Sequence, residues 1–404
     1  MDSPSAAAPP PAPPPRAVGW RMLAPLVLIT ASGPVSMQMF LPALADLRQD
    51  LGVSAFLAQM TISVALLTFG IAMLLWGPAS DRFGRRAPLI AGVVLFIAGN
   101  VVCAIAPTIE VLIAGRVLNA LGGAAGMVLT RAMVRDVADP SRVASAMSLL
   151  TVGQIVPPML APAVGGLLTE AYGWRMNFVV LVAVGAVAGL LALRLPETHH
   201  GRGAATALSG MIGGFGRLLR VPRFRGLAFF GAAAIAAYFA FLSGAPLVAV
   251  GALGMSPSAY GIAFISISLS FMAGNMVSAR LSPRLGIDRM VLLGGICALS
   301  GAAVALGLAL AHVWVPLALF APTMLVAFGN GLSLNNAQAG AMAVDDRLVG
   351  AAAGLTGFLQ MATGAAVAQV VGLTYDGSPV PMAVVMTLAG LLALGFYGLG
   401  RMSK

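Results

Sequence analysis

The sequence predicts an all-α membrane protein with twelve transmembrane helices arranged as two six-helix halves. Three observations support this fold class: 59% of the 404 residues are hydrophobic, only 9% are charged, and the apolar residues come in long runs. An ordinary soluble domain contains roughly 25% charged residues. A soluble fold of this length would need more polar surface, so we expect the lipid bilayer to surround the chain.

The apolar runs are long enough to cross a bilayer. Residues 143–168, for example, contain no Lys, Arg, Asp, Glu or His, and roughly 18 such residues suffice to suggest a span. The expected spans are 22–43, 54–78, 87–106, 111–135, 143–168, 174–195, 226–250, 257–281, 288–310, 314–338, 347–373 and 379–400.

The net charge of +10 is distributed unevenly between the two sides of this topology. On one side, Arg48 and Arg175 are the basic residues, whereas the loops of the other side are rich in arginine. Positive charge marks the cytoplasmic side of a membrane protein. We therefore expect a multi-pass protein of the bacterial inner membrane with both termini in the cytoplasm. Because topology explains the charge, no nucleic-acid partner is expected.

Polar stretches divide the chain into four parts. Residues 1–20 form a Pro/Ala-rich tail that we expect to be disordered and cytoplasmic, because it has too little apolar surface to bury. An N-terminal six-helix half over 21–196 and a C-terminal six-helix half over 223–404 flank a cytoplasmic linker over 197–222. This linker is the longest polar interruption in the chain.

The two halves carry related loops after their second spans. Aligning Gly84 with Gly286 places the halves about half a chain length apart, although the counterpart of Asp81 is then Pro283. Internal duplication with a binding site at the repeat interface is common in secondary transporters. No ATP-binding Walker sequence is present, and no nucleophile–base constellation or metal cluster indicates an enzyme.

The first of these loops carries the most specific pattern in the sequence. It contains Gly77, Asp81, Arg82, Gly84, Arg85 and Arg86. The spacing resembles the loop between the second and third helices of the major facilitator superfamily, and the resemblance covers the chain beyond residue 20. It implies the major facilitator fold and transport by alternating access.

The same resemblance implies that these loop residues form a gate that closes the cytoplasmic side. Asp81 would meet the start of the eleventh helix near Gly350, and Arg85 would pair with Asp136 at the inner end of the fourth. Gly84 would permit a tight turn. A loop that only orients the chain in the membrane is the alternative.

A second family pattern covers residues 116–122 of the fourth span and begins with Arg116. A charged side chain inside a membrane span is costly, so Arg116 should face the interior of the helix bundle. The alternative is that its side chain reaches the outer membrane surface near Glu110.

The fifth span resembles exporters in this superfamily. Ala161, Pro162, Gly165 and Gly166 look like their Gly-Pro-x-x-Gly-Gly element, with alanine in place of the first glycine. Further short matches, including residues 131–136, 173–178 and 195–198, resemble the bicyclomycin and chloramphenicol resistance branch of drug/proton antiporters. That branch has an aspartate in the first helix where this chain has Gln38.

Polar groups deep in lipid are costly and therefore indicate function, and the family's cavity is lined by helices 1, 4, 7 and 10. Tyr238 and Phe241 are spaced to share a helix face, where they could stack on a ligand or pack on a neighbouring helix. The candidate substrate-binding residues are Gln38, Phe40, Arg116, Asn119, Gln154, Tyr238, Phe241, Asn335 and Gln360.

Proton coupling needs a group that changes protonation between the two sides of the membrane. Because Gln38 cannot titrate, Asp46 at the outer end of the first span is the coupling candidate. Protonation of the substrate itself and weak coupling are the alternatives. The expected energy source is the proton gradient, and no cofactor or metal is expected, since Cys103 and Cys297 are both inside spans.

These patterns predict a monomeric secondary transporter that exports small amphipathic drug-like molecules across the inner membrane, driven by proton antiport. Its partners are the small-molecule substrate and the lipid bilayer. A dedicated exporter of one metabolite, such as an amino-acid derivative, nucleoside or sugar, is the alternative. Uptake and a non-transporting receptor or scaffold are more distant alternatives.

Overall fold

A computed structural model describes residues 20–138, 143–199, 208–345 and 348–402 of the chain. Helices dominate this part of the chain, and it contains no β-strand. Twelve helices are long and apolar enough to cross a membrane, which confirms the predicted fold class. The tail predicted over 1–20 lies outside the described residues except for Trp20, which already belongs to the first helix.

The first half contains the six spans predicted for it. α1 continues through a short 3-10 turn, η1, into α2, and the three together form the first span. The bounds are α1 Trp20–Met39, η1 Leu41–Ala43, α2 Leu44–Asp50, α3 Ala55–Phe83, α4 Arg86–Ala104, α5 Ile109–Val137, α6 Val143–Tyr172 and α7 Arg175–Ala192.

The second half repeats this arrangement after one additional helix, α8. The bounds are α8 Leu208–Arg220, α9 Pro222–Pro246, η2 Leu247–Ala252, α10 Pro257–Leu285, α11 Ile287–Leu310, α12 Pro316–Met342, α13 Val349–Thr374 and α14 Val380–Met402. The predicted linker therefore contains a helix that sequence analysis did not identify. Leu218 of α8 is buried against the second half, whereas Arg217 and Arg220 are exposed.

The backbone confirms that the two halves share one design. α3 and α10 are both 29 residues long, and each begins with a serine, Ser54 or Ser256, whose hydroxyl accepts the backbone N–H three residues later. Each helix ends at a glycine with positive φ, 83° at Gly84 and 80° at Gly286. A side chain is strained in this conformation, so glycine is needed for both turns.

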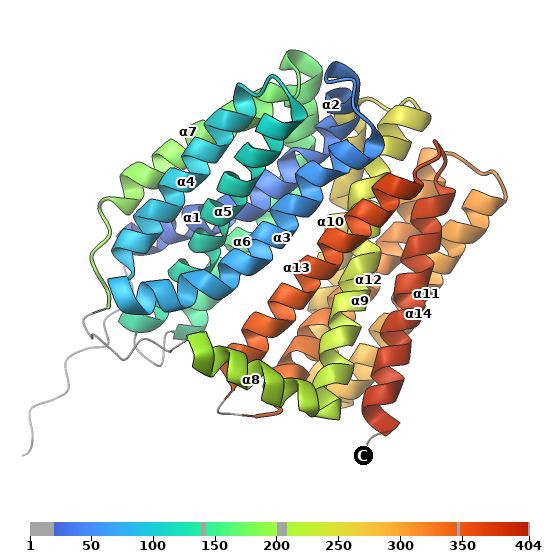
Figure 1. The fold of residues 1–404 in the computed structure, drawn as a ribbon. Helices are drawn as coiled ribbons and strands as arrows, with labels where there is room; N and C mark the ends of the chain where they lie inside the picture. The colour runs from blue at the N-terminus through green and yellow to red at the C-terminus, as the bar shows by residue number, and fades with distance from the viewer. Residues whose placement is uncertain (1–19, 139–142, 200–207, 346–347, 403–404) are drawn as a thin grey trace, which may run out of the picture.

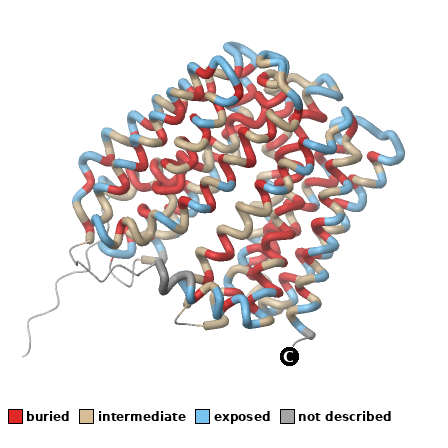
Figure 2. The backbone as a smooth tube through the Cα atoms, viewed as in Figure 1, coloured by how far each residue is buried: buried red, intermediate tan, exposed pale blue. Residues whose placement is uncertain are grey.

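The surface is apolar where lipid would cover it. Figure 2 shows exposed residues along the outward sides of the peripheral helices and buried residues between the helices. Large side chains such as Ile105, Leu317 and Leu373 are 71%, 74% and 67% exposed. Exposed apolar surface on this scale is typical of a membrane protein.

The two halves lie side by side and diverge toward one end (Figure 1). That end holds α8 and the C-terminus, and we call it the inner end, whereas the end that holds α2 is the outer end. Close contacts join the halves near the outer end: a Cβ atom added to Gly166 of α6 would lie 2.2 Å from the carbonyl oxygen of Pro257 on α10. Small residues therefore allow the close approach of this α6 segment to α10.

Candidate functional site

A cavity of about 210 Å³ lies between the two halves. Its walls come from α1, α6, α9, α10 and α12, and they combine apolar side chains with a few polar groups. The lining residues are Gln38, Gln154, Ile155, Pro158, Met159, Ile235, Tyr238, Ile267, Ser268, Phe271 and Asn330. Apolar walls with few polar anchors are typical of sites for small organic molecules.

Three predicted substrate-binding residues, Gln38, Gln154 and Tyr238, line this cavity. Gln38 on α1 donates a hydrogen bond of 3.4 Å to the hydroxyl of Tyr238 on α9. The side-chain oxygens of Gln38 and of Asn330, another lining residue, are buried and have no hydrogen-bond partner in the described part of the chain. Unpaired buried acceptors are costly, so a ligand that donates to them would relieve that cost.

Gln154 connects the cavity wall to a buried hydroxyl and to an arginine. Its amide nitrogen donates to Thr30 of α1 at 2.8 Å. Its amide oxygen accepts a hydrogen bond of 2.6 Å from the guanidinium of Arg131 on α5. The guanidinium of Arg131 therefore lies next to Gln154 of the cavity wall.

Arg116 faces the interior of the first half, as predicted, and is only 1% exposed. Its guanidinium donates to the backbone oxygen of Thr61 at 3.2 Å and to both oxygens of Ser36 at 3.4 Å. Ser36 also donates to the amide oxygen of Asn119 at 3.0 Å. The alternative in which Arg116 reaches the outer surface is wrong, and Arg116 and Asn119 lie behind the cavity wall rather than on it.

Two predicted aromatic contacts lie in the core instead of at the cavity. Phe40 is fully buried against Phe178, with ring centroids 5.2 Å apart. Phe241 is fully buried between Phe264 and Phe320. The predicted placement of Phe40 and Phe241 on the cavity wall is therefore corrected. Three residues turn a helix by about 300°, so the side chains of Tyr238 and Phe241 point in directions about 60° apart. This difference places Phe241 in the core and Tyr238 on the cavity wall.

The other two predicted contacts also lie off the described cavity. Asn335 of α12 is exposed and donates to the amide oxygen of Asn275 on α10 at 2.8 Å. Gln360 of α13 is half-buried beside Gly231 of α9. In this conformation α13 packs on α3 and α9, and the side chain of Gln360 lies against α9.

At the inner end, Arg85 is the centre of the predicted gate. Its guanidinium contacts Asp136 at 3.0 Å, Asp81 at 2.6 Å and the hydroxyl of Ser80 at 2.5 Å. The pair Arg85–Asp136 implied by the family resemblance is therefore present. The gating role of these residues stays a prediction.

Asp81 does not reach α13 in this conformation. Among the described residues its partner is Arg85, and a Cβ atom added to Gly350 would meet nothing within 4 Å. The register of α3 and α13 nevertheless points to Gly350, because Gly70 faces Met361 and Leu74 faces Gly354. The separation of the halves at the inner end explains the missing contact (Figure 1).

Glu197 binds the loop around Gly84, residues 77–86, which we call the gate loop. This contact with the end of the first half was not predicted from the sequence. The carboxylate of Glu197 accepts the backbone N–H groups of Arg85 at 2.8 Å, Arg86 at 3.1 Å, Thr198 at 2.9 Å and His199 at 3.0 Å. Burial opposes ionisation of Glu197, but these four donors hold its pKa below the usual range of a glutamate. A Cβ atom at Gly84 would lie 2.6 Å from this carboxylate, so glycine is also needed for the contact.

The remaining gate residues lie around this network. Gly77 accepts a hydrogen bond of 2.8 Å from Ser80 through its carbonyl oxygen. Arg82 stacks over the ring of Phe83, and Arg86 donates to the carbonyl oxygen of Leu193 at 2.7 Å. These contacts stay within the first half and join the loop to it.

The coupling candidate Asp46 lies on α2 at the outer end. It is half-buried, and the nearby Glu170 repels its charge. No ion pair involves Asp46 in the part of the chain that the structure describes. The cavity-lining residues include no carboxylate, so Asp46 is separate from the cavity.

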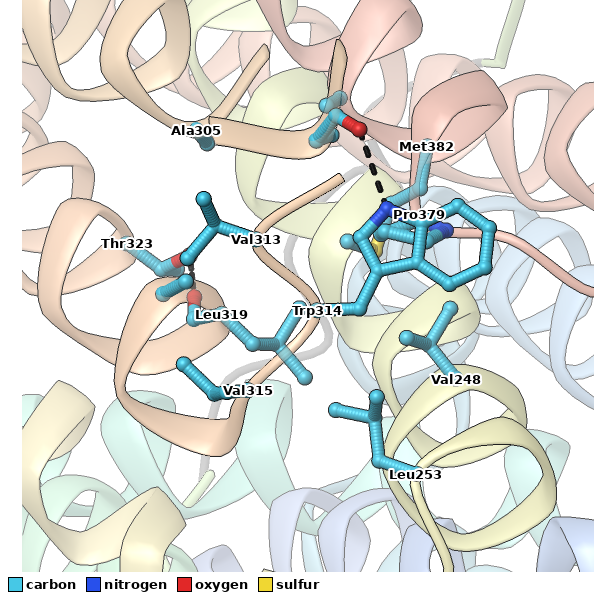
Figure 3. Close-up of a pocket in the computed structure, with 13 residues that line it drawn as sticks. Val248, Leu253, Ala305, Val313, Trp314, Val315, Leu319, Thr323, Pro379 and Met382 are labelled. Atoms are coloured by element: carbon cyan, nitrogen blue, oxygen red, sulfur yellow. Dashed lines mark hydrogen bonds between the residues drawn. The ribbon is translucent and has the colours of Figure 1, made fainter. Parts of the chain in front are cut away.

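A second pocket at the outer end is too small to bind a drug-sized molecule. It measures about 20 Å³ and is lined almost entirely by apolar side chains around Trp314 (Figure 3). The indole nitrogen of Trp314 donates to the carbonyl oxygen of Ala309 at 3.0 Å, and the hydroxyl of Thr323 donates to that of Leu319 at 2.8 Å. Their polar atoms are thus satisfied, and room for about one water remains.

The predicted substrate-binding residues did not include Arg131, and Asn330 was only one of several polar span residues ranked below them. Both are in expected spans, and a polar residue within a span was an available signal. The sequence does not show which face of a helix points to a cavity formed by five helices. Only packing places Asn330 on the wall and directs Arg131 toward Gln154.

Comparison with known proteins agrees with this architecture. Residues 26–369 match the model of the Major Facilitator Superfamily. An uncharacterized MFS-type transporter of Bacillus subtilis is 32% identical, with coverage of 93% of this chain and 94% of that protein. Multidrug resistance protein D of Escherichia coli is 31% identical, with coverage of 92% and 93%.

A chloramphenicol resistance protein of Pseudomonas aeruginosa is 29% identical over 81% of this chain and 77% of its own length. The fold also matches the crystal structure of a peptide transporter in complex with alafosfalin. The TM-score is 0.77 at 17% identity, and the match covers 96% of this chain and 97% of that one. At this identity the likeness concerns the fold alone.

Proposed function

This chain belongs to the major facilitator superfamily, and from that premise we propose that it exports small amphipathic drug-like molecules across the inner membrane. It is a multi-pass membrane transporter with a small-molecule substrate, and it is not an enzyme. The observation that carries the proposal is the cavity between the halves, with apolar walls and two unpaired amide oxygens. Relatives named for multidrug and chloramphenicol resistance support it.

The arrangement of the halves supports an alternating-access cycle. α6 and α10 meet near the outer end, whereas the halves diverge toward the inner end (Figure 1). In the proposed cycle, substrate enters the cavity from the inner end, and closure of that end releases it outward. The arginine-rich loops support a cytoplasmic location of the inner end and of both termini. We propose a monomer without cofactor, driven by the proton gradient.

The test is a susceptibility and accumulation panel across chemically varied compounds. It compares cells that overproduce the protein with cells that lack it. We expect resistance and lower accumulation for several amphipathic compounds. Resistance to a single chemical class would indicate a dedicated metabolite exporter, and higher accumulation would indicate uptake. No change for any compound would contradict transport of drug-like molecules.

A pair of variants controls for expression and insertion. Ser268 lines the cavity and is half-buried, so Ser268→Phe should fill the cavity and abolish resistance. Ser300 on α11 is exposed on the outward surface, so Ser300→Phe adds the same ring where lipid accommodates it. Equal resistance in both variants would contradict the placement of the substrate in this cavity.

A further inference from the structure

Arg131 is an intramembrane cation that the gate does not use. It lies on α5, four residues before Arg135, and is exposed. Its guanidinium donates to the side-chain oxygen of Gln154, a residue of the cavity wall, at 2.6 Å. Among the described residues no carboxylate forms an ion pair with Arg131.

The side chain of Arg131 points away from the inner membrane surface. Arg131 is six residues before the inner end of α5 at Val137, and Gln154 is eleven residues beyond the inner end of α6 at Val143. At 1.5 Å per residue these positions are about 9 Å and about 16 Å from the helix ends. An arginine that only sought water would extend toward the near surface, whereas Arg131 extends toward the deeper Gln154.

The surroundings of the cavity contain positive charge without a matching negative charge. The polar lining groups are amides and hydroxyls, which are neutral. Arg131 lies next to the lining residue Gln154, and Arg116 is buried behind the lining; neither has a carboxylate partner in the described part of the chain. The inner carboxylates, Asp81 and Asp136, already share Arg85.

We propose that the cavity selects substrates that carry an anionic group, and that Arg131 is the residue that recognises this group. The proposal rests on the export function above and names the charge class of its substrates. Only one of the five guanidinium N–H groups is used by Gln154. The others can form charge-assisted hydrogen bonds to a carboxylate, sulfonate or similar anion. A cationic substrate would meet repulsion from Arg131, and the described cavity lining offers no carboxylate to offset it.

The unpaired hydrogen-bond acceptors of the cavity wall indicate which other polar groups the substrate carries. The side-chain oxygens of Gln38 and Asn330 lack donors, so the remainder of the molecule should offer N–H or O–H groups. A substrate with an apolar body, one acidic group and one or more hydrogen-bond donors would match the apolar lining, Arg131 and the unpaired oxygens. The same site disfavours lipophilic cations, because its described lining contains no carboxylate.

The test uses the full-length protein in proteoliposomes and three xanthene dyes that share one ring system. Fluorescein is anionic, rhodamine 110 carries a free carboxylate, and rhodamine 123 is the cationic methyl ester. We expect the half-saturating concentration to be lowest for fluorescein and highest for rhodamine 123. Rhodamine 110 and rhodamine 123 differ in one free carboxylate and should be about tenfold apart, which corresponds to one ion-pair interaction of about 1.4 kcal/mol. Arg131→Gln should raise the value for fluorescein about tenfold and leave that for rhodamine 123 within about twofold.

Two further variants separate recognition from a structural role. Arg131→Lys keeps the charge and should restore most of the preference. Arg135→Gln removes the same charge one turn away, at the exposed inner surface, and should leave all three dyes unchanged. Preference for rhodamine 123 in the wild type, or an equal loss for all dyes in Arg131→Gln, would overturn the proposal. Absence of export for every dye would instead contradict the proposed function itself.

Discussion

Gln38 of α1 and Tyr238 of α9 are 200 positions apart in the sequence and meet at the wall of the central cavity. The hydrogen bond between them is long, at 3.4 Å, and it joins the two halves of the molecule. The family resemblance implies an aspartate at the position of Gln38, and the structure has a neutral contact between the halves there.

Removal of the Tyr238 hydroxyl should weaken substrate binding without unfolding the protein. Tyr238→Phe removes the hydroxyl that fixes the Gln38 amide on the cavity wall, and ordering that side chain again on binding should cost about 1 kcal/mol, or about fivefold in apparent affinity. Transport in proteoliposomes as a function of substrate concentration would measure it. Tyr260→Phe is the matched control, because the buried Tyr260 hydroxyl has no partner among the described residues. Identical behaviour of the two variants would contradict a role for Tyr238.

Arg116→Lys should destabilise the first half. A lysine keeps the charge but not the planar fork that reaches Thr61 and Ser36 from one side chain. Losing a hydrogen bond from a buried charged group costs about 1.5–3 kcal/mol, so the thermal unfolding temperature of the purified protein should fall by several degrees. Arg135→Lys, at an exposed position of the same helix, should leave it unchanged. Equal unfolding temperatures for both variants would show that the fork is dispensable.

Glu197→Gln should loosen the gate loop in a pH-dependent way. The folded-state pKa of Glu197 is lowered, so its ionised form stabilises the fold above the unfolded pKa of about 4.3. This stabilisation is lost as the pH falls through the lower folded pKa. At pH 7 we expect the variant to be less stable by about 1 kcal/mol, allowing for screening by solvent.

Thermal unfolding of the purified wild type and variant between pH 7 and pH 3 would measure the difference. The difference in unfolding temperature between the wild type and Glu197→Gln should narrow once the pH is below about 4. A gap that stays constant over this range would indicate that the carboxylate charge is irrelevant to the loop.

Asp81→Asn should impair closure of the inner end. The register of α3 and α13 directs Asp81 to Gly350 when the halves approach, where the start of a helix favours an anion. We expect the transport rate to fall about fivefold. This factor corresponds to about 1 kcal/mol, the low end of typical coupling free energies between distant sites. Membrane insertion should be unaffected, because acidic residues contribute little to topology.

Labelling of Ile155→Cys by a membrane-impermeant thiol reagent reports the exposure of the cavity. The background would lack Cys103 and Cys297. Asp81→Asn should increase labelling from the inner side. Asp376→Asn, in a loop at the outer end, should not change it. Unchanged transport together with unchanged labelling in Asp81→Asn would remove the gating role.

Asp46→Asn tests the proton coupling that we propose. Asp46 is the coupling candidate because it is half-buried at the outer end of the first span, and the described residues that line the cavity include no carboxylate. The variant should lose uphill export under an imposed pH gradient and retain exchange down a substrate gradient. Asp50→Asn is the control, since Asp50 is occupied by Trp174 and Arg175. Full gradient-driven transport by Asp46→Asn would exclude this residue and favour coupling through an acidic substrate.

The amino-acid sequence alone determined the fold class, the twelve spans, the duplication and the turn at Gly84 between the second and third spans. These features depend on local quantities: the length of apolar runs, the side of the arginines and the backbone freedom of Gly84 and Gly286. The interior position of Arg116 was also predictable, because an exposed charge in lipid is costly.

Only the tertiary structure decided which polar groups line the cavity. Phe241 and Tyr238 are three residues apart, yet one is in an aromatic core and the other is on the wall. Likewise, the direction of Arg131 toward Gln154 and the capture of the gate loop by Glu197 are contacts between distant segments. The cavity arises where five helices of two halves converge, so a rotation of any helix by some tens of degrees changes its lining, and no local pattern encodes that rotation.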